Sequence, residues 1–302
     1  QHIRVINKFE ILSICEKFRN MENRVSVIIP TLNRRELIQR ALDSVLCQTH
    51  PIHEIIVVDN GSTDKTVPML YEKYPSVKIL KEKKPGVSSA RNTGIISAEG
   101  DWIALLDSDD SWSTEKIEKQ LAFYRSSGKD LRLIHTSEIW YKNGKVLNQK
   151  NKHSKAGGDI FKECVSLCCI SPSSVLIRKD LFSDIGYFDE KLLVCEDYDF
   201  WLRVSSQEEV LFVDEPLTFK FGGHLDQLSK KYWGMDRFRV RALEKLLING
   251  NLTKAQFVIA FQGLLTRLKI LHQGAKKRHN LEIEEIYRDK ILVWQETFNK
   301  KI

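Results

Sequence analysis

The sequence predicts an α/β fold, in which a mostly parallel sheet is flanked by helices and followed by a helical extension at the C-terminus. Short runs of β-branched and other apolar residues alternate with stretches of helical periodicity between residues 25 and 106, which is the pattern of βαβ units. Acidic and polar residues follow directly after three of these runs. Beyond residue 232 the apolar positions recur as they do in amphipathic helices.

The elements can be placed from this periodicity. We expect strands over residues 25–29, 55–58, 77–80 and 102–106, and helices over 35–48, 63–74 and 88–98. Further on, the pattern predicts a helix over 115–126, a strand pair from residue 131 that turns at Asn143-Gly144, a strand over 173–177 and a helix over 197–206. The C-terminal helices are expected to break at residues 249–251 and near Gly274.

Three segments follow from this reading. Residues 1–23 are expected to form an N-terminal extension that is non-native or weakly docked, because the chain starts at Gln1 and Met21 stands just before the first strand. Residues 24–225 hold the alternating strands and helices, and residues 226–302 form a basic helical region. The first 20 residues mix apolar and charged side chains, unlike the apolar stretch of a signal peptide.

Composition excludes several classes of protein. The 302 residues are 42% hydrophobic and 29% charged, a mixture that excludes disordered chains, collagen-like chains and small disulfide scaffolds. No apolar run approaches the roughly 18 residues that a membrane-spanning helix needs. We expect a cytoplasmic protein whose cysteines are reduced and mostly buried, since no CxxC pair occurs among Cys15, Cys47, Cys164, Cys168, Cys169 and Cys195.

The positive charge is confined to the C-terminal part of the chain. Residues 221–302 hold 16 lysines and arginines against 8 acidic residues, a balance of +8, whereas residues 1–220 carry −1. A solvated helical face is the plain explanation of such an excess, and contact with an anionic lipid surface, a nucleic acid or an anionic glycan is the alternative. No nucleic-acid partner is expected, because aromatic residues do not interleave with the positive charge.

Carboxylates gather where ligands bind in parallel sheets, at the carboxyl ends of the strands. Asp59 follows the second strand and could equally well cap the next helix. Asp107-Ser108-Asp109 follows the fourth strand and directs two carboxylates toward one point. Mg²⁺ typically takes one or two carboxylates together with phosphate oxygens. An isolated Asp-x-Asp is weak evidence, since Asp is common in turns, but its position after a buried strand strengthens it.

Two familiar phosphate-binding loops do not occur in the sequence. Neither GxGxxG after a strand nor GxxxxGK[ST] is present, which excludes a Rossmann dinucleotide site and a Walker A loop. A divalent cation, Mn²⁺ or Mg²⁺, is therefore expected to offset phosphate charge that a glycine-rich loop would otherwise hold.

Four segments in order, together with a fifth near residue 200, resemble one protein family. They are Val-Ser-Val-Ile-Ile-Pro-Thr-Leu-Asn-Arg (25–34), Glu-Ile-Ile-Val-Val-Asp-Asn-Gly-Ser-Thr-Asp (54–64), Gly-Val-Ser-Ser-Ala-Arg-Asn-Thr-Gly (86–94), Leu-Leu-Asp-Ser-Asp-Asp (105–110) and Glu-Asp-Tyr-Asp-Phe-Trp-Leu-Arg (196–203). Over residues 24–225 the chain is similar to the family 2 glycosyltransferases of GT-A fold. Each motif is weak alone, and five in the right order are strong.

The resemblance implies roles for particular residues. It places the nucleotide in a pocket formed by Pro30, Thr31, Asn33, Arg34, Asp59, Arg91, Asp107 and Ser108. Asp59 matches the carboxylate that recognises a uracil-type base, so a UDP-sugar is the favoured donor. Asp107 and Asp109 match the pair that meets the ribose and, through Mn²⁺ or Mg²⁺, the diphosphate. His224, in a loop opened by two glycines, is the candidate third metal ligand, with an ordinary loop histidine as the alternative.

The resemblance also implies an inverting mechanism. Asp197 matches the catalytic base, with Glu196 beside it as a supporting carboxylate, although acids at a helix N-terminus are common for electrostatic reasons alone. Asp199 lies nearby, so the sequence leaves open which carboxylate is the base. A single base on the face opposite the leaving group gives in-line displacement and an inverted product.

The acceptor is expected to be a saccharide or a glycolipid hydroxyl in surface polysaccharide or glycoconjugate biosynthesis. Trp140, Trp201 or Trp233 could stack on an acceptor sugar, although such residues more often anchor a core; we assign Trp201 to the core and leave Trp233 open. The basic C-terminal helices are expected to pack on the catalytic domain, on a second copy in a homodimer, or peripherally on the inner face of a membrane.

Two other functions compete with glycosyl transfer. A catalytically silent nucleotide-sugar-binding scaffold would not need both Asp107-x-Asp109 and the Glu196-Asp197 pair. A sugar nucleotidyltransferase would also have an α/β sheet and a divalent metal. Such an enzyme normally contains a glycine-rich basic loop after the first strand, where this chain has Pro30-Thr31-Leu32-Asn33.

Overall fold

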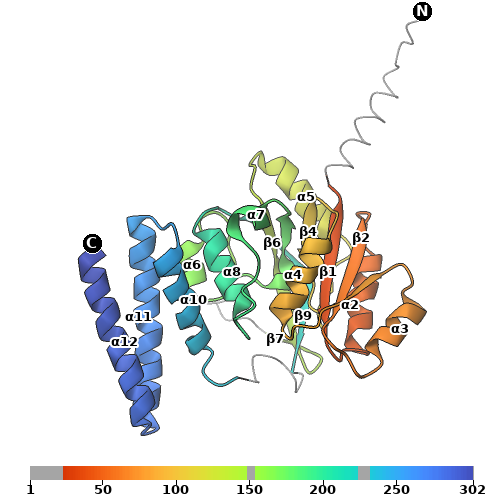
Figure 1. The fold of residues 1–302 in the computed structure, drawn as a ribbon. Coiled ribbons are helices and arrows are strands. Elements are labelled where there is room, and N and C mark those ends of the chain that lie inside the picture. Colours follow the sequence, from red (N-terminus) through yellow and green to blue (C-terminus); the bar gives the residue numbers. More distant parts are fainter. Residues whose placement is uncertain (1–22, 148–153, 224–231, 302) are drawn as a thin grey trace, which may run out of the picture.

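The computed structural model describes residues 23–147, 154–223 and 232–301. Its centre is a nine-stranded mixed sheet in the order β3-β2-β1-β4-β8-β6-β9-β5, with β7 paired to β6 (Figure 1). The strands are β1 Val25–Thr31, β2 Glu54–Asp59, β3 Lys78–Lys81, β4 Trp102–Leu105, β5 Ser111–Trp112, β6 Leu133–Lys142, β7 Lys145–Leu147, β8 Leu176–Arg178 and β9 Leu211–Gly222. The α/β class predicted from the sequence is confirmed.

Strands β3, β2, β1 and β4 form a parallel half sheet, as their alternation with helices predicts. The other half is mixed: β8 runs antiparallel to both β4 and β6, while β9 runs parallel to β6. The connecting helices are α2 Leu37–Leu46, α3 Thr66–Lys73, α4 Val87–Ser97, α5 Lys116–Ser127, α6 Phe161–Ser166, α7 Leu181–Ile185 and α8 Glu196–Ser205.

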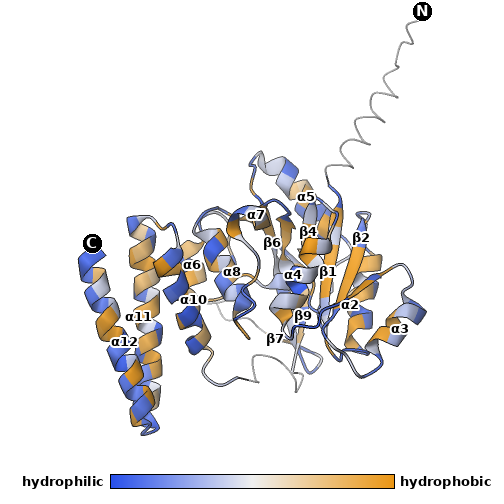
Figure 2. Ribbon diagram, viewed as in Figure 1, coloured by the Kyte–Doolittle hydropathy of each residue, from blue (hydrophilic) through white to orange (hydrophobic). Residues whose placement is uncertain are grey.

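The sheet separates two apolar cores. Along β1, Val25, Val27 and Ile29 face the core that contains α2, α3 and α5, whereas Ile28 faces the core that contains α4 and α6 to α8. A strand sends successive side chains to opposite faces, so a sheet covered on both sides needs continuous apolar runs rather than alternation. Figure 2 shows these central strands as the most hydrophobic part of the ribbon.

Three expectations about the elements need correction. Strand β9, the longest in the sheet, was not predicted, because Asp214, Glu215 and Pro216 interrupt its apolar pattern. The strand expected over residues 173–177 is instead a 3₁₀ turn at Pro172–Ser174 followed by β8. The C-terminal break expected near Gly274 lies later, since helix α11 continues through that glycine to Lys277.

The C-terminal helices extend the core rather than stand apart from it. They are α10 Asp236–Asn249, α11 Lys254–Lys277 and α12 Leu281–Lys301. Apolar residues of α10 and α11 belong to the same core as α6 and α8, and α12 packs outside α11. Hydrophilic and apolar residues alternate along all three helices (Figure 2). None of the helices in the described part of the chain is both long enough and apolar enough to cross a membrane.

The close approach of α4 to β1 gives a test of the fold. A Cβ on Gly94 in α4 would lie 2.4 Å from Cγ2 of Ile28 in β1, and overpacking of this kind typically costs about 1–3 kcal/mol. We expect Gly94→Ala to lower the free energy of unfolding by that amount, as measured by urea denaturation.

Gly274→Ala in α11 is the matched control. A Cβ there would meet only the mobile end of Arg278, at 3.2 Å, and alanine is intrinsically the better helix former by about 1 kcal/mol. This variant should be neutral or more stable. Equal losses of stability in the two variants would contradict the close packing of α4 against β1.

Candidate functional site

The carboxyl ends of β1, β2 and β4 meet at one edge of the sheet. Thr31 at the end of β1 pairs in register with Asp59 at the end of β2. Strand β4 lies on the other side of β1, and Asp107 follows two residues after Leu105, its last residue. The parallel arrangement therefore brings three polar segments together, as expected for the binding edge of an α/β sheet.

Side chains of the first two loops hold each other in place. The Thr63 amide donates to Oδ1 of Asn33 over 2.7 Å, and the Asn33 amide donates to Oγ of Ser62 over 2.9 Å. Asn33 has φ +54°, a left-handed conformation that Asn tolerates better than most residues. The buried hydroxyl of Thr31 has no hydrogen-bond partner in the described part of the chain. The first loop thus presents a fixed, incompletely satisfied polar surface.

Asp59 organises its own turn rather than capping the next helix. Its buried carboxylate accepts the backbone amides of Gly61 and Ser62 over 3.1–3.3 Å. The capping role belongs to Asp64, which accepts the Thr66 amide at the start of α3. Asp59 therefore sits at the base of the strand-end loops, where the sequence places it.

Arg91 joins the two acidic motifs. The residue is only 3% exposed, and its guanidinium donates to Oδ1 of Asp107 over 2.7 Å and to Oε1 of Glu196 over 2.6 Å. These partners lie 16 and 105 residues from Arg91 along the chain. A buried guanidinium needs such compensation, because an unpaired buried charge is strongly destabilising. Arg91 thereby fixes the strand-end turn against the start of α8.

The electrostatics of this bridge differ at its two ends. Burial by itself would raise the pKa of Asp107, but the charges of Arg91 and Lys220 outweigh it and lower that pKa. Burial and the charge of Asp197 raise the pKa of Glu196 to about 7, although Arg91 opposes the shift. Asp107 therefore stays ionised, whereas Glu196 can hold a proton near neutral pH.

The three carboxylates at the start of α8 have different surroundings. Glu196 is paired with Arg91, and Asp199 is buried in ion pairs with Arg203 and Lys245, at 3.0 and 2.8 Å. Asp197 is half-exposed and forms no ion pair with any described residue. Of these three carboxylates, only that of Asp197 combines access to solvent with the absence of an ion pair to a described residue.

A thiol contacts Asp197 from α6 and the loop that follows it. Sγ of Cys168 lies 3.4 Å from Oδ2 of Asp197. Burial and the charge of Asp197 raise the pKa of the Cys168 thiol well above its usual value, so the thiol remains protonated and donates to the carboxylate. All five cysteines in the described part of the chain are free thiols.

The turn after β4 is held by Ser173 and Lys220. The Ser173 hydroxyl donates to Oδ2 of Asp110 over 2.6 Å and accepts the Asp107 amide over 3.1 Å. Nζ of Lys220, on β9, lies 3.3 Å from Oδ2 of Asp110. Burial raises the pKa of Asp110 to about 7 in spite of this lysine. Asp110 thus helps to hold the turn in place through its contacts with Ser173 and Lys220.

Asp109 is the carboxylate of this turn without an ion-pair partner among the described residues. Burial and the charge of Asp107 raise the pKa of Asp109. A cation bound by both carboxylates would therefore reduce the electrostatic repulsion between them. No group of three acidic, histidine or cysteine side chains suited to a metal occurs in the described ranges. The predicted third ligand, His224, lies outside the described residues.

With this geometry in view, the chain can be compared with known proteins. Residues 26–186, more than half of the chain, match the family described as Glycosyl transferase family 2. The chain belongs to glycosyl transferase family 2. It is 33% identical over 205 residues to an uncharacterized glycosyltransferase of Rickettsia felis, an alignment of 65% of this chain and 33% of that protein. It is 44% identical over 108 residues, 34% of this chain and 43% of the relative, to TuaG of Bacillus subtilis.

Solved structures share the fold of this family 2 chain. TarS residues 1–349 of S. aureus, in complex with UDP-GlcNAc, superimposes with a TM-score of 0.64 and 24% identity over 81% of this chain and 71% of that one. The mannosyltransferase PcManGT of Pyrobaculum calidifontis, in complex with GDP-Man and Mn²⁺, gives a TM-score of 0.57 and 16% identity over 94% and 91% of the two chains. These likenesses confirm the expected GT-A fold.

Most of the residues predicted for the site of this glycosyltransferase family member lie close to one another. Pro30, Thr31, Asn33 and Asp59 belong to the paired ends of β1 and β2, and Ser108 lies in the turn after β4. Arg34 follows Asn33, and its amide donates to Oγ1 of Thr66 over 3.2 Å. Arg91 is the direct physical link to Glu196.

Two residues that hold the turn after β4 were missed from the sequence. Ser173 is one of many serines and carries no recognisable signal. Lys220 had one: in Leu217-Thr-Phe-Lys-Phe221, strand alternation places Thr218 and Lys220 on one face, and both contact the segments around the turn. Recognition of β9 as a strand would have drawn attention to this lysine.

The raised pKa of Glu196 predicts a dependence of stability on pH. Its folded pKa of about 7 lies above the ordinary value of 4.5, so its protonated form contributes stability that is present below about pH 4.5 and is lost as pH rises through 7. Glutamine does not titrate, so the Glu196→Gln variant does not lose this stability as the pH rises. We expect the free energy of unfolding of the variant, relative to wild type, to increase by about 1–3 kcal/mol between pH 5 and 8 in urea denaturation.

Glu190→Gln serves as the control for this measurement. The hydrogen bonds from Lys84 and Asn92 lower the pKa of Glu190, so its contribution changes only below about pH 4.5. The difference between this variant and wild type should stay constant from pH 5 to 8. A constant difference for Glu196→Gln as well would show that Glu196 is ionised throughout.

Proposed function

We propose that this chain transfers a sugar from a nucleotide sugar, most favourably a UDP-sugar, to a hydroxyl of a saccharide or glycolipid with inversion at the anomeric carbon. The observation that carries the proposal is the Arg91 bridge, which joins the acidic turn after β4 to the start of α8. Donor charge would be bound on one side of this bridge and the acceptor hydroxyl deprotonated on the other. The family membership supports the class of reaction.

The donor side is the edge formed by the ends of β1, β2 and β4. Thr31, Asn33, Arg34 and Ser108 would line the nucleotide, and Asp59 would organise the loop against the base. The neighbours of similar fold were solved with UDP-GlcNAc and with GDP-Man, which supports a nucleotide sugar here. UDP remains our preferred nucleotide because Asp59 occupies the position at which a carboxylate recognises a uracil edge in the family.

A divalent cation fits the donor side. Asp107 and Asp109 offer two adjacent carboxylates, one ionised and one destabilised by burial and repulsion, while phosphate oxygens would complete the shell as Mg²⁺ and Mn²⁺ allow. PcManGT was solved with Mn²⁺. Such an ion would stabilise the charge that develops on the departing diphosphate.

On the acceptor side, Asp197 would take the proton of the attacking hydroxyl. Its half-exposed carboxylate forms no ion pair with any described residue, and burial together with the charge of Asp197 raises the pKa of the neighbouring Glu196 to about 7. Attack from the face opposite the diphosphate would invert the anomeric configuration, with no covalent sugar intermediate. Cys168 would orient Asp197 through its hydrogen bond.

The setting we propose is the assembly of a surface polysaccharide or glycoconjugate. TuaG, whose name places it in teichuronic acid biosynthesis, is 44% identical over its aligned region. If the acceptor is lipid-linked, the cationic end of α11, with Lys276, Lys277 and Arg278, would be the part that meets anionic headgroups.

The Asp109→Ala variant tests the proposed donor site. We expect wild type to bind UDP in the presence of Mn²⁺, and the variant to bind it at least 10-fold more weakly and without dependence on Mn²⁺, because one of two carboxylates facing the cation is gone. Isothermal titration calorimetry with UDP, GDP, CMP and dTDP, each with and without Mn²⁺, measures both effects.

Asp214→Ala makes the same change at an exposed position of β9 and should leave nucleotide binding unaltered. A wild type that binds none of the four nucleotides, with or without metal, would refute the proposed function and favour a scaffold role for the fold.

The catalytic half is tested by Asp197→Asn. We expect the rate of glycosyl transfer to fall by about 10²–10⁴-fold, the usual contribution of a general base, while UDP affinity and stability stay at wild-type levels. Transfer is measured with labelled UDP-sugars, and proton NMR of the product reports its anomeric configuration. A retained configuration would contradict the mechanism.

Asp199→Asn, on the same helix, separates a structural carboxylate from a catalytic one. Its carboxylate is buried and pairs with Arg203 and Lys245, so the substitution should lower the thermal midpoint of unfolding. A loss of stability in Asp197→Asn equal to that in Asp199→Asn would show that Asp197 is also structural.

A further inference from the structure

We propose that an open pocket between Trp233 and the turn joining α11 to α12 is a subsite for an anionic sugar unit of the acceptor. The proposal rests on the function proposed above and adds the chemical class of the acceptor. It is independent of the acidic turn after β4, none of whose residues line this pocket.

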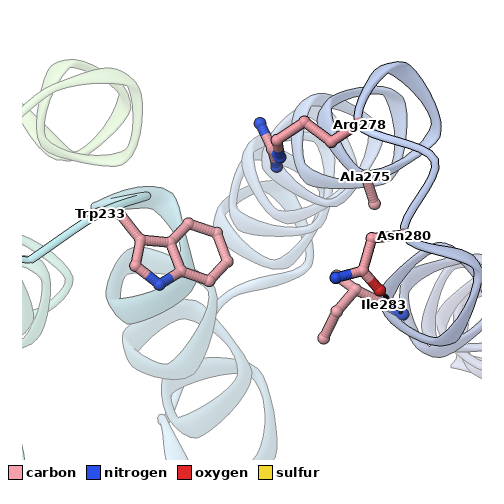
Figure 3. A pocket seen from close by; sticks show the side chains of 5 residues that line it. All are labelled: Trp233, Ala275, Arg278, Asn280 and Ile283. Carbon is pink, nitrogen blue, oxygen red and sulfur yellow. Dashed lines mark hydrogen bonds between the residues drawn. The ribbon is translucent and has the colours of Figure 1, made fainter.

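The pocket is formed by Trp233, Ala275, Arg278, Asn280 and Ile283 and has a volume of about 370 Å³. This lies within the range of about 300–1,000 Å³ that is typical of small-ligand sites. Figure 3 shows the indole on one side, facing Arg278 at the end of α11 and Asn280 and Ile283 at the start of α12. The opening between them contains an aromatic face, a guanidinium and an amide.

Trp233 is 56% exposed, which is unusual for a tryptophan in a folded chain, since this side chain is highly buried on average. The Arg237 guanidinium packs over its ring at 3.9 Å, and the Arg278 guanidinium lies 5.8 Å from the ring centroid. The backbone carbonyl of Trp233 also accepts a hydrogen bond from Arg237 over 2.9 Å. The indole is therefore held in place although much of it faces solvent.

The Arg278 side chain has no hydrogen bond or ion pair with any described residue. This contrasts with Arg288 and Lys290 on α12, which pair with Glu285 and Glu244. Lys276 and Lys277 precede Arg278 on one side of the pocket, while Glu282 and Glu284 flank Ile283 on the other. A planar guanidinium with unused donors suits a carboxylate or phosphate, which it can bind through two parallel hydrogen bonds.

Asn280 adds a neutral donor. Its side-chain oxygen accepts the Ile283 amide over 3.1 Å, which fixes the orientation of the side-chain amide at the start of α12. The amide nitrogen then points toward the side of the pocket occupied by Trp233 (Figure 3). A ligand here would meet an apolar aromatic face, a neutral donor and an unpaired cation.

This combination matches a pyranose that carries an acidic group. The apolar face of a sugar ring can pack on an indole, its hydroxyls can accept from the Asn280 amide, and its carboxylate or phosphate can bind Arg278. A neutral sugar would leave the guanidinium unused, and an inorganic anion would leave the indole unused.

The segment that carries Trp233 lies near the start of α8, which carries the proposed base. Two residues after Trp233, the Met235 carbonyl lies 3.9 Å from Sγ of Cys195, the residue that precedes Glu196 and Asp197. Two residues of chain span about 7 Å at most, so Trp233 is anchored close to the start of α8. An acceptor of several sugar units that places one hydroxyl at Asp197 can therefore reach this pocket with another unit.

The test follows the indole N–H resonance of Trp233 by NMR in the full chain. The Trp233→Phe variant assigns this resonance by its loss. The probes are tetragalacturonate, its fully methyl-esterified form, a tetrasaccharide phosphomonoester, inorganic phosphate and UDP with Mn²⁺. The two galacturonate probes share the sugar rings and differ at the carboxyl groups, which are anionic in one and neutral methyl esters in the other, so they separate recognition of the anion from recognition of the sugar.

We expect tetragalacturonate or the phosphorylated tetrasaccharide to shift the Trp233 resonance, with an affinity at least 10-fold above that of the neutral ester and of inorganic phosphate. Arg278→Gln should lower the affinity for the acidic probe at least 5-fold and remove the preference over the ester. Arg288→Gln, which removes the same charge on the outer face of α12, should change neither. The resonances of buried Trp102 and Trp112 should not move.

Three outcomes would overturn the subsite: no shift with either acidic saccharide, equal binding of the ester and the acid, or an equal effect of Arg278→Gln and Arg288→Gln. A shift produced by UDP with Mn²⁺ at Trp233 would identify a nucleotide site instead. Calorimetry of UDP with Mn²⁺ on the same sample separates the two proposals, because failure of the subsite alone leaves UDP binding intact, whereas failure of the function removes it.

Discussion

The buried Arg91 guanidinium is the contact on which the organisation of this site depends. It lies between Asp107 and Glu196, two carboxylates that belong to different elements and to distant parts of the chain. An unpaired cation at this depth would be costly, so the acidic turn and the start of α8 must come together for the core to form. Asp197, the neighbour of Glu196, is half-exposed and forms no ion pair with any described residue, although it accepts hydrogen bonds from the Cys168 thiol and the Tyr198 amide. Adjacent residues at the start of α8 therefore differ in whether a cation compensates their charge.

Carboxylates with and without a cationic partner occur on both sides of the Arg91 bridge. Asp110 and Asp199 are buried supports, held by Ser173 and Lys220 in one case and by Arg203 and Lys245 in the other. Asp109 and Asp197 are more exposed and form no such ion pairs with described residues. Each acidic motif therefore contains carboxylates compensated by buried cations and one carboxylate without a described ion-pair partner.

The C-terminal helices relate to this arrangement through α8. Apolar residues of α10 and α11 share the core that buries Tyr198 and Trp201, so the helix that carries Asp197 is covered on its outer side by the basic region. The segment before α10 brings Trp233 to the same end of α8. Part of the positively charged region is thereby placed beside the start of α8.

The sequence by itself determined the α/β class, the four parallel strands, the assignment of Trp201 to the core and the acidic motifs at the strand ends, because these depend on local periodicity and on where a strand stops. It did not reveal β9, because polar residues interrupt the apolar pattern of that strand. It also did not reveal the roles of Ser173 and Lys220, which lie far along the chain from the acidic turn that they hold. It matched Asp197 to a catalytic base with Glu196 beside it, but with Asp199 nearby it left the choice among these carboxylates open. Tertiary structure alone distinguished them, since a carboxylate's role depends on which distant cation is packed against it.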